Sequence, residues 1–220
     1  MPDTGQMRLY TYFRSSAAYR LRIALNLKGI DWQPVSVNLA AGEQRGSDYL
    51  AVNVQGLVPA LEIEGGETLA QSVALLEYLE ETHPEPPLLP AGAVDRARVR
   101  AMVGLIACDI HPLNNLRILK YLKDPLGADQ EAVDIWYRRW IARGFEALEQ
   151  LVAQYGTPDG YCFGETVTLA DVLLVPQVYN ARRFETDLTP YPRLVEVDAR
   201  LQALDAFADA VPEVQPDAPK

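Results

Sequence analysis

The sequence predicts a small α/β domain followed by an all-α domain. Three observations indicate this division. Over the first 84 residues, short apolar and aromatic runs typical of strands alternate with helical patterns. A proline-rich segment at residues 84–90 then excludes a helix and is typical of a linker. From residue 95 onward no strand pattern appears, and long helical patterns dominate.

The first strand–helix–strand unit is predicted from residue types at its ends. Residues 9–13 are aromatic-rich and favour a strand. Ser15 and Ser16 offer N-cap oxygens to a helix that ends near Lys28, which a glycine follows. Residues 31–38 favour a second strand, which a proline weakens at its start. Because a helix separates the two strands, we expect them to pair in parallel.

The second half of this domain is predicted to be a hairpin between two helices. Residues 43–50 favour a short polar helix, and residues 57–63 a strand entered through a proline. A glycine turn at 64–67 leads to a return strand at 68–70, and residues 71–82 form an amphipathic helix. The order β-α-β-α-β-β-α indicates a small mixed sheet in a thioredoxin-like domain.

The remaining segments are expected to be helices joined by loops. Thr168 and Asp171 have the spacing of a capping box, so a helix is expected from there toward residue 182. The other expected helices cover residues 96–122, 130–155 and 191–210, with a loop at 211–220. The predicted boundaries are 7–84 for the α/β domain, 85–93 for the linker and 94–212 for the helical domain.

Composition excludes several classes of function. The chain has 220 residues, of which 49% are hydrophobic and 23% charged, so a disordered chain is excluded. A net charge of −10 argues against a nucleic-acid partner. No apolar stretch approaches the ~18 residues of a membrane span, and no signal peptide is visible, which predicts a cytoplasmic protein without a membrane partner. Two cysteines and two histidines, none in a metal-binding spacing, predict no metal site.

The start of the first helix is suited to hold an anion. A helix N-terminus carries about half a positive charge and unpaired N–H groups. A sulfur placed there would have its thiol pKa lowered, and a serine hydroxyl can donate one more hydrogen bond to the thiolate. Helix capping alone would also explain one of the two serines, Ser15 and Ser16.

Six motifs, in order along nearly the whole chain, resemble the zeta class of the cytosolic glutathione transferases. They comprise residues 12–25, 55–61, 71–72, 109–117, 174–178 and 183–192. The resemblance implies that glutathione is the cofactor and that its thiolate lies at Ser15 or Ser16, with Ser15 favoured. Ala17 stands where many zeta-class members have cysteine, so glutathione is the only nucleophile in view.

The resemblance also implies the residues that hold the rest of glutathione. Val58-Pro59 resembles the cis-proline loop that pairs with the cysteinyl backbone, and Gln71 and Ser72 are implied to bind the γ-glutamyl carboxylate. A helix N-cap is the simpler interpretation of Ser72. Further implied contacts are Gln44, Gln55, His111 and Asn115. For His111 a packed structural role is an equal alternative.

The implied substrate is a small dicarboxylate, so an acidic protein has to supply local cations. Arg14, Arg117 and Arg183 are the candidates, and Arg14 directly precedes the serine pair. The implied activity is cis–trans isomerisation of maleylacetoacetate to fumarylacetoacetate, with Ser15, Ser16 and Arg14 as catalytic residues. Alternatives are isomerisation of maleylpyruvate, conjugation or dehalogenation, and a binding module without turnover. A homodimer is expected from the resemblance.

Overall fold

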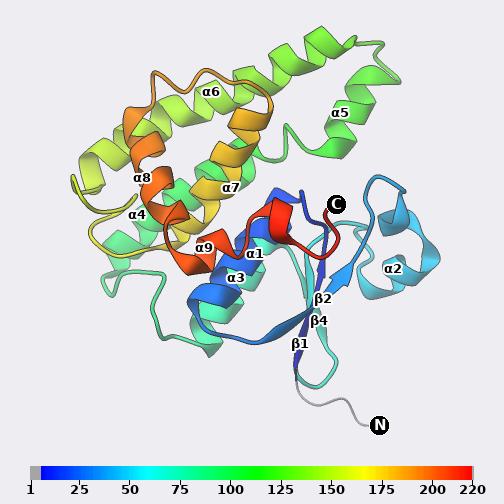
Figure 1. Cartoon of the computed structure of the whole chain (residues 1–220), viewed down its shortest axis with the longest axis horizontal. Helices are drawn as coiled ribbons and strands as arrows, with labels where there is room; N and C mark the ends of the chain where they lie inside the picture. The colour runs from blue at the N-terminus through cyan, green and yellow to red at the C-terminus, as the bar shows by residue number, and fades with distance from the viewer. Residues whose placement is uncertain (1–5, 220) are drawn as a thin grey trace. The chain divides into compact units, whose positions relative to one another are not determined.

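The computed structural model describes residues 6–219, which form two compact units (Figure 1). The first unit contains the described residues up to Pro87 together with those from Ala203 onward, and the second contains Leu88–Gln202. The elements of the first unit are β1 (Met7–Thr11), α1 (Ser16–Leu27), β2 (Trp32–Ser36), the 3₁₀ turn η1 (Glu43–Arg45), α2 (Ser47–Val52), β3 (Ala60–Glu62), β4 (Thr68–Ala70), α3 (Ser72–Thr82), α9 (Asp205–Ala208) and the 3₁₀ turn η3 (Pro212–Val214).

The strands form one mixed sheet in the order β2-β1-β3-β4. β1 and β2 are parallel, with Met7 opposite Trp32, whereas β3 pairs antiparallel with both β1 and β4. The predicted parallel pair and antiparallel hairpin are therefore confirmed. This topology places the end of β1 and the start of β3 side by side, and both lead into loops that carry predicted site residues.

Alternating side chains of the sheet pack on helices at its two faces. Tyr10 of β1 belongs to the apolar cluster that includes Tyr49 of α2 and Val58. Leu9 and Leu61, paired across β1 and β3, are fully buried. Figure 1 shows α1 and α3 side by side against the sheet, away from α2. Burial on both faces fixes the register, because a slip of one residue would exchange the two faces.

The C-terminal segment returns to the first unit. α9 packs against α1, and the buried guanidinium of Arg22 donates through Nε to the carbonyl oxygen of Ala210 at 3.0 Å. Asn26 donates to the carbonyl oxygen of Ala206 at 3.0 Å. The residues after 202 thus cluster with the α/β elements, whereas the sequence-based boundaries placed those up to 212 in the helical domain. The expected loop at 211–220 also contains η3.

The second unit is helical. Its elements are α4 (Ala93–Gly104), the π-helical stretch η2 (Leu105–Ile110), α5 (Leu116–Lys123), α6 (Gln130–Tyr155), α7 (Leu169–Arg183) and α8 (Pro192–Gln202). The helix predicted over 130–155 is confirmed. So is the capping box, in which the backbone N–H and hydroxyl of Thr168 both donate to the Asp171 carboxylate at 2.7 and 2.8 Å.

Two predicted helices are wrong in extent. The one expected over 96–122 ends in η2, because Pro112 lacks an N–H and Asn115 caps a new helix, α5. η2 packs closely on α6, where a Cβ on Gly144 would lie 2.2 Å from Ile110. The helix expected over 191–210 is likewise divided into α8 and α9. Among the described residues no helix is both long and apolar enough to cross a membrane.

Candidate functional site

Ser15 caps the first helix. Its backbone is extended, with φ −70° and ψ 114°, and its hydroxyl oxygen accepts a hydrogen bond of 3.3 Å from the Ala18 N–H. Ser16 is the first helical residue and is buried. The N-cap predicted for this pair is therefore confirmed at Ser15. The half-buried Ser15 stands at the positive end of a 12-residue helix, where an anion is stabilised.

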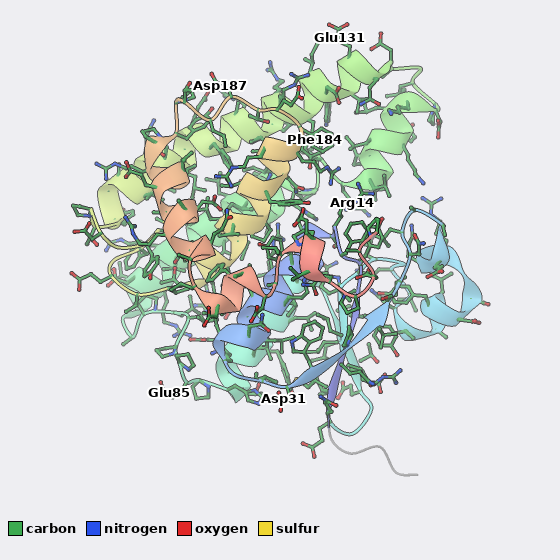
Figure 2. All side chains as sticks on the ribbon, viewed as in Figure 1. Arg14, Asp31, Glu85, Glu131, Phe184 and Asp187 are labelled. Carbon is green, nitrogen blue, oxygen red and sulfur yellow. The ribbon has the colours of Figure 1, made fainter. Side chains whose placement is uncertain are left out.

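The loop before this serine carries an exposed cation. The guanidinium of Arg14 lies 5.0 Å from the centre of the Phe13 ring, within cation–π range, and Figure 2 labels Arg14 at this end of the first unit. The ring of Phe13 is buried, and its carbonyl oxygen accepts a 3.0 Å hydrogen bond from Arg22. Arg14 therefore follows a residue, Phe13, that is held in place, and it lies directly before the start of α1.

The loop that enters β3 offers free backbone groups. The Val58–Pro59 bond is cis, as in the cis-proline loop that this segment resembles. Tyr49 and Asn53 fix this loop by donating to the carbonyl oxygen of Leu57 at 2.6 and 2.8 Å. Burial raises the pKa of Tyr49 to about 12, so its hydroxyl stays a donor at neutral pH. Within residues 6–219, no hydrogen bond uses the backbone N–H or C=O of Val58, so both can pair with a peptide.

The start of α3 has groups suited to a second anion. Gln71 precedes the helix with φ 74° and ψ 111°, and its side chain does not cap the first turn. Ser72 is buried, and its hydroxyl accepts a hydrogen bond of 3.2 Å from the buried guanidinium of Arg20. Uncapped N–H groups, a hydroxyl and a nearby cation are the groups that hold a carboxylate.

Two further predicted residues lie along the same side of this loop region. Gln71 Nε2 donates to Gln55 Oε1 at 2.8 Å. A Cβ on Gly56 would lie 2.8 Å from the carbonyl oxygen of Gln44, and the φ of +60° at Gly56 also favours glycine. Gln44 is buried, and its Oε1 has no hydrogen-bond partner among residues 6–219. The first unit thus joins Gln55 and Gln71 by a hydrogen bond and packs the Gln44 backbone against Gly56.

The predicted residues at 111–117 do not share one helix. His111 closes the π-helical stretch, its N–H donating to the Ile106 carbonyl oxygen at 2.9 Å. Asn115 caps α5, its side chain accepting from the Arg117 N–H at 3.1 Å. Arg117 is exposed in the first turn of α5. The helix expected over 96–122 therefore does not carry these three residues together, because the chain turns between residues 111 and 115.

Arg183 ends α7 beside two aromatic rings. Its guanidinium lies 4.7 Å from the ring centre of Phe184, which Figure 2 labels, and that ring stacks on Tyr137 at 3.5 Å. Burial raises the pKa of Tyr137 to about 12, and the charge of Arg183 opposes this shift. The guanidinium is exposed, so it can pair with a carboxylate while its flat face stays on the ring.

One contact was not foreseen from the sequence. Arg20 reaches Ser72 across 52 positions of sequence, and an arginine within an apolar helix does not indicate its partner. In residues 6–219 no three His, Cys, Asp or Glu side chains are grouped to hold a metal ion. The described site is therefore made of helix starts, free backbone groups and arginines.

Family models match both halves of the chain. The model of the glutathione S-transferase N-terminal domain matches residues 14–82, and that of the C-terminal domain matches residues 134–210. Maleylpyruvate isomerase of Ralstonia sp. is 51% identical, covering 96% of this chain and 99% of its own. Probable maleylacetoacetate isomerase of Vibrio cholerae is 50% identical, covering 96% and 97%.

Solved structures agree with these relatives. The holo structure of a maleylpyruvate isomerase, described as a zeta-class bacterial glutathione S-transferase, superposes with a TM-score of 0.92 at 50% identity, covering 96% of this chain and all of that one. Maleylacetoacetate isomerase of Methylobacterium extorquens, with bound malonate and glutathione, gives a TM-score of 0.92 at 39% identity, covering 97% of this chain and all of that one.

Proposed function

Since the chain belongs to the zeta class of the glutathione S-transferase family, we propose that it is a glutathione-dependent isomerase that converts maleylacetoacetate to fumarylacetoacetate. The observation that carries the proposal lies in the first unit. A capped helix start at Ser15, an open backbone at Val58 and an uncapped helix start at Ser72 match the thiol, the backbone and the γ-glutamyl carboxylate of one tripeptide.

In the proposed complex each part of glutathione meets a fitting group. The cysteinyl backbone pairs with the N–H and C=O of Val58, beside Pro59. The γ-glutamyl carboxylate accepts from the first N–H groups of α3 and from Ser72, and the cation of Arg20 favours its charge. Gln44, Gln55, His111 and Asn115 are assigned as further contacts, on the strength of the family resemblance. The thiol sulfur lies at the start of α1.

The reaction uses that sulfur as a thiolate. The dipole of α1 and the hydroxyl of Ser15, assisted by Ser16, stabilise the anion and lower its pKa. The thiolate adds to one carbon of the cis C=C bond, and the electron pair moves to the conjugated carbonyl as an enolate. The former double bond is now single and rotates. When the enolate collapses, it restores the C=C bond in trans geometry and expels the thiolate, so glutathione is regenerated.

The arginines supply the positive charge that the substrate needs. We assign Arg14, Arg117 and Arg183 to the two carboxylates and to the developing enolate charge. All three arginines are exposed. They supply local positive charge in a protein whose net charge is −10. The malonate bound by the Methylobacterium enzyme supports a dicarboxylate substrate.

Maleylpyruvate is the second candidate substrate. It has the same cis double bond and two carboxylates but a shorter chain, and the Ralstonia relative that acts on it is 51% identical. The proposal also includes a cytoplasmic location and, as the family resemblance implies, a homodimer.

The test is turnover of each substrate with and without glutathione, followed by the loss of the cis compound's ultraviolet absorbance. We expect turnover only with glutathione, and the ratio of kcat/KM for maleylacetone, a maleylacetoacetate analogue, and maleylpyruvate selects the substrate. Bound glutathione without turnover of either compound would contradict the isomerase and favour conjugation or a binding role.

A further inference from the structure

The peptide groups of Phe13 are held from the C-terminal segment. A carboxylate oxygen of Asp217, Oδ2, accepts a hydrogen bond of 2.8 Å from the Phe13 N–H, across 204 positions of sequence. The Phe13 carbonyl oxygen accepts from Arg22, whose Nε donates to Ala210. Both polar backbone groups of Phe13 are therefore satisfied by groups that depend on the fold of the last residues.

The tail that carries Asp217 is itself ordered. The side-chain amide of Gln215 donates to the carbonyl oxygens of Asp209 and Val211, both at 3.0 Å, and the Ala218 N–H closes a turn on the Gln215 carbonyl at 3.0 Å. Gln215 is buried. Figure 1 shows this segment, in red, running back from α9 beside α1. Asp217 thus lies in a turn that these hydrogen bonds hold in place.

Phe13 lies at the centre of the proposed thiolate loop. Its ring supports the guanidinium of Arg14, and the turn that contains it is closed by the hydrogen bond from the Ser15 N–H to the Tyr12 carbonyl oxygen at 2.9 Å. A rotation of the Phe13 peptide would therefore move Arg14 and the Ser15 cap together. A charge-assisted hydrogen bond at this peptide is stronger than a neutral one and restrains that rotation.

We propose that Asp217 is a positioning residue for the thiolate loop: its carboxylate holds the Phe13 peptide so that Arg14 and Ser15 face the reacting groups. This inference rests on the proposed function, since it assumes that the glutathione thiolate lies at the start of α1. Asp217 touches neither glutathione nor substrate in this account. It acts through the backbone of Phe13.

The test compares three variants of the full chain. Asp217→Ala removes the acceptor, whereas Asp217→Asn keeps an oxygen that can accept the same hydrogen bond. Asp209→Ala removes an exposed carboxylate from the same C-terminal segment and serves as the matched control. The measurements are the hydrogen exchange of the Phe13 amide, the pKa of the thiol of bound glutathione, kcat/KM and the melting temperature.

We expect Asp217→Ala to speed exchange at Phe13, to raise the thiol pKa and to lower kcat/KM about tenfold, which corresponds to about 1.4 kcal/mol. Asp217→Asn, which keeps a neutral form of the bond, should change these three quantities less than Asp217→Ala, and Asp209→Ala should leave them close to the wild type. The inference is overturned if Asp217→Ala leaves the thiol pKa and kcat/KM unchanged, or if Asp217→Asn loses as much as Asp217→Ala. A wild-type protein without isomerase activity would overturn the proposed function instead, while the exchange rate and thiol pKa would still test Asp217.

Discussion

The side-chain amide of Gln71 donates a hydrogen bond of 2.8 Å to the side-chain oxygen of Gln55, and this bond joins two loops of the proposed glutathione site. Gln71 makes it from a backbone with φ 74°, which a non-glycine residue rarely adopts. Such strain costs about 1–3 kcal/mol and is usually retained only where function requires it. The relationship indicates that stability is given up at this position to prepare the site.

The first prediction follows from that strain. In Gln71→Gly, glycine adopts the positive φ freely, which offsets the greater flexibility that it gives the unfolded chain. We expect the free energy of unfolding to stay within about 1 kcal/mol of the wild type, while glutathione binds more weakly. Denaturant unfolding and calorimetric titration measure the two quantities. Unchanged binding would show that the Gln55–Gln71 bond does not prepare the site.

The second prediction separates the two serines. Ser15→Ala removes the N-cap, costing about 1 kcal/mol of stability, and should raise the thiol pKa of bound glutathione by about one unit, or about 1.4 kcal/mol. Ser16→Ala should change the thiol pKa less. Ser47→Ala, at the start of α2, is a matched serine removal outside the site. A larger effect at Ser16 than at Ser15 would assign the sulfur contact to Ser16.

The third prediction concerns the arginines. Arg14→Ala, Arg117→Ala and Arg183→Ala should each raise the KM for the dicarboxylate by about tenfold or more, because a charge-assisted bond contributes about 1.5–3 kcal/mol. Glutathione affinity should change little. Arg143→Ala, which removes an exposed guanidinium that pairs with Glu146, is the control. An arginine whose removal leaves KM unchanged has no part in binding the substrate.

The fourth prediction is a pH dependence of stability. Burial raises the pKa of Asp198, although Gln202 and Arg182 donate to its carboxylate and oppose the shift. The native state therefore binds this proton more tightly than the unfolded chain, whose value is about 3.9. Stability from this group is complete below that value and is lost as the pH rises through the higher native pKa.

Asp198→Asn cannot titrate, so its stability relative to the wild type should increase with pH across that window. Urea unfolding between acidic and neutral pH measures the difference, and Asp205→Asn, an exposed carboxyl, controls for the loss of one charge. A difference that does not depend on pH would contradict the raised pKa.

Local sequence signals predicted most of the fold. The N-cap at Ser15, the capping box at Thr168 and Asp171, and the hairpin that ends at β4 depend on residues close together in the sequence. The division of the helix expected over 96–122 was missed, since the apolar period continues through Pro112 while the backbone does not. The spacing of apolar residues indicates which side of a helix is buried. It does not indicate whether the helix is continuous.

The residues of the candidate site likewise divide into those that local sequence signals predict and those that they do not. Val58 and Ser72 lie at motifs that are contiguous in sequence, so their places could be predicted. The contacts of Ser72 with Arg20 and of Phe13 with Asp217 span 52 and 204 positions. Such partners come together only in the folded chain. Neither their residue types nor their spacing in the sequence predicts the contact.

The most direct test of the account is conversion of the cis substrate with much less glutathione than substrate. Reversible thiolate addition predicts complete conversion to the trans product, with all of the glutathione recovered unchanged. Conversion that stops when the glutathione has been consumed as a stable adduct, or that proceeds equally without glutathione, would contradict the account.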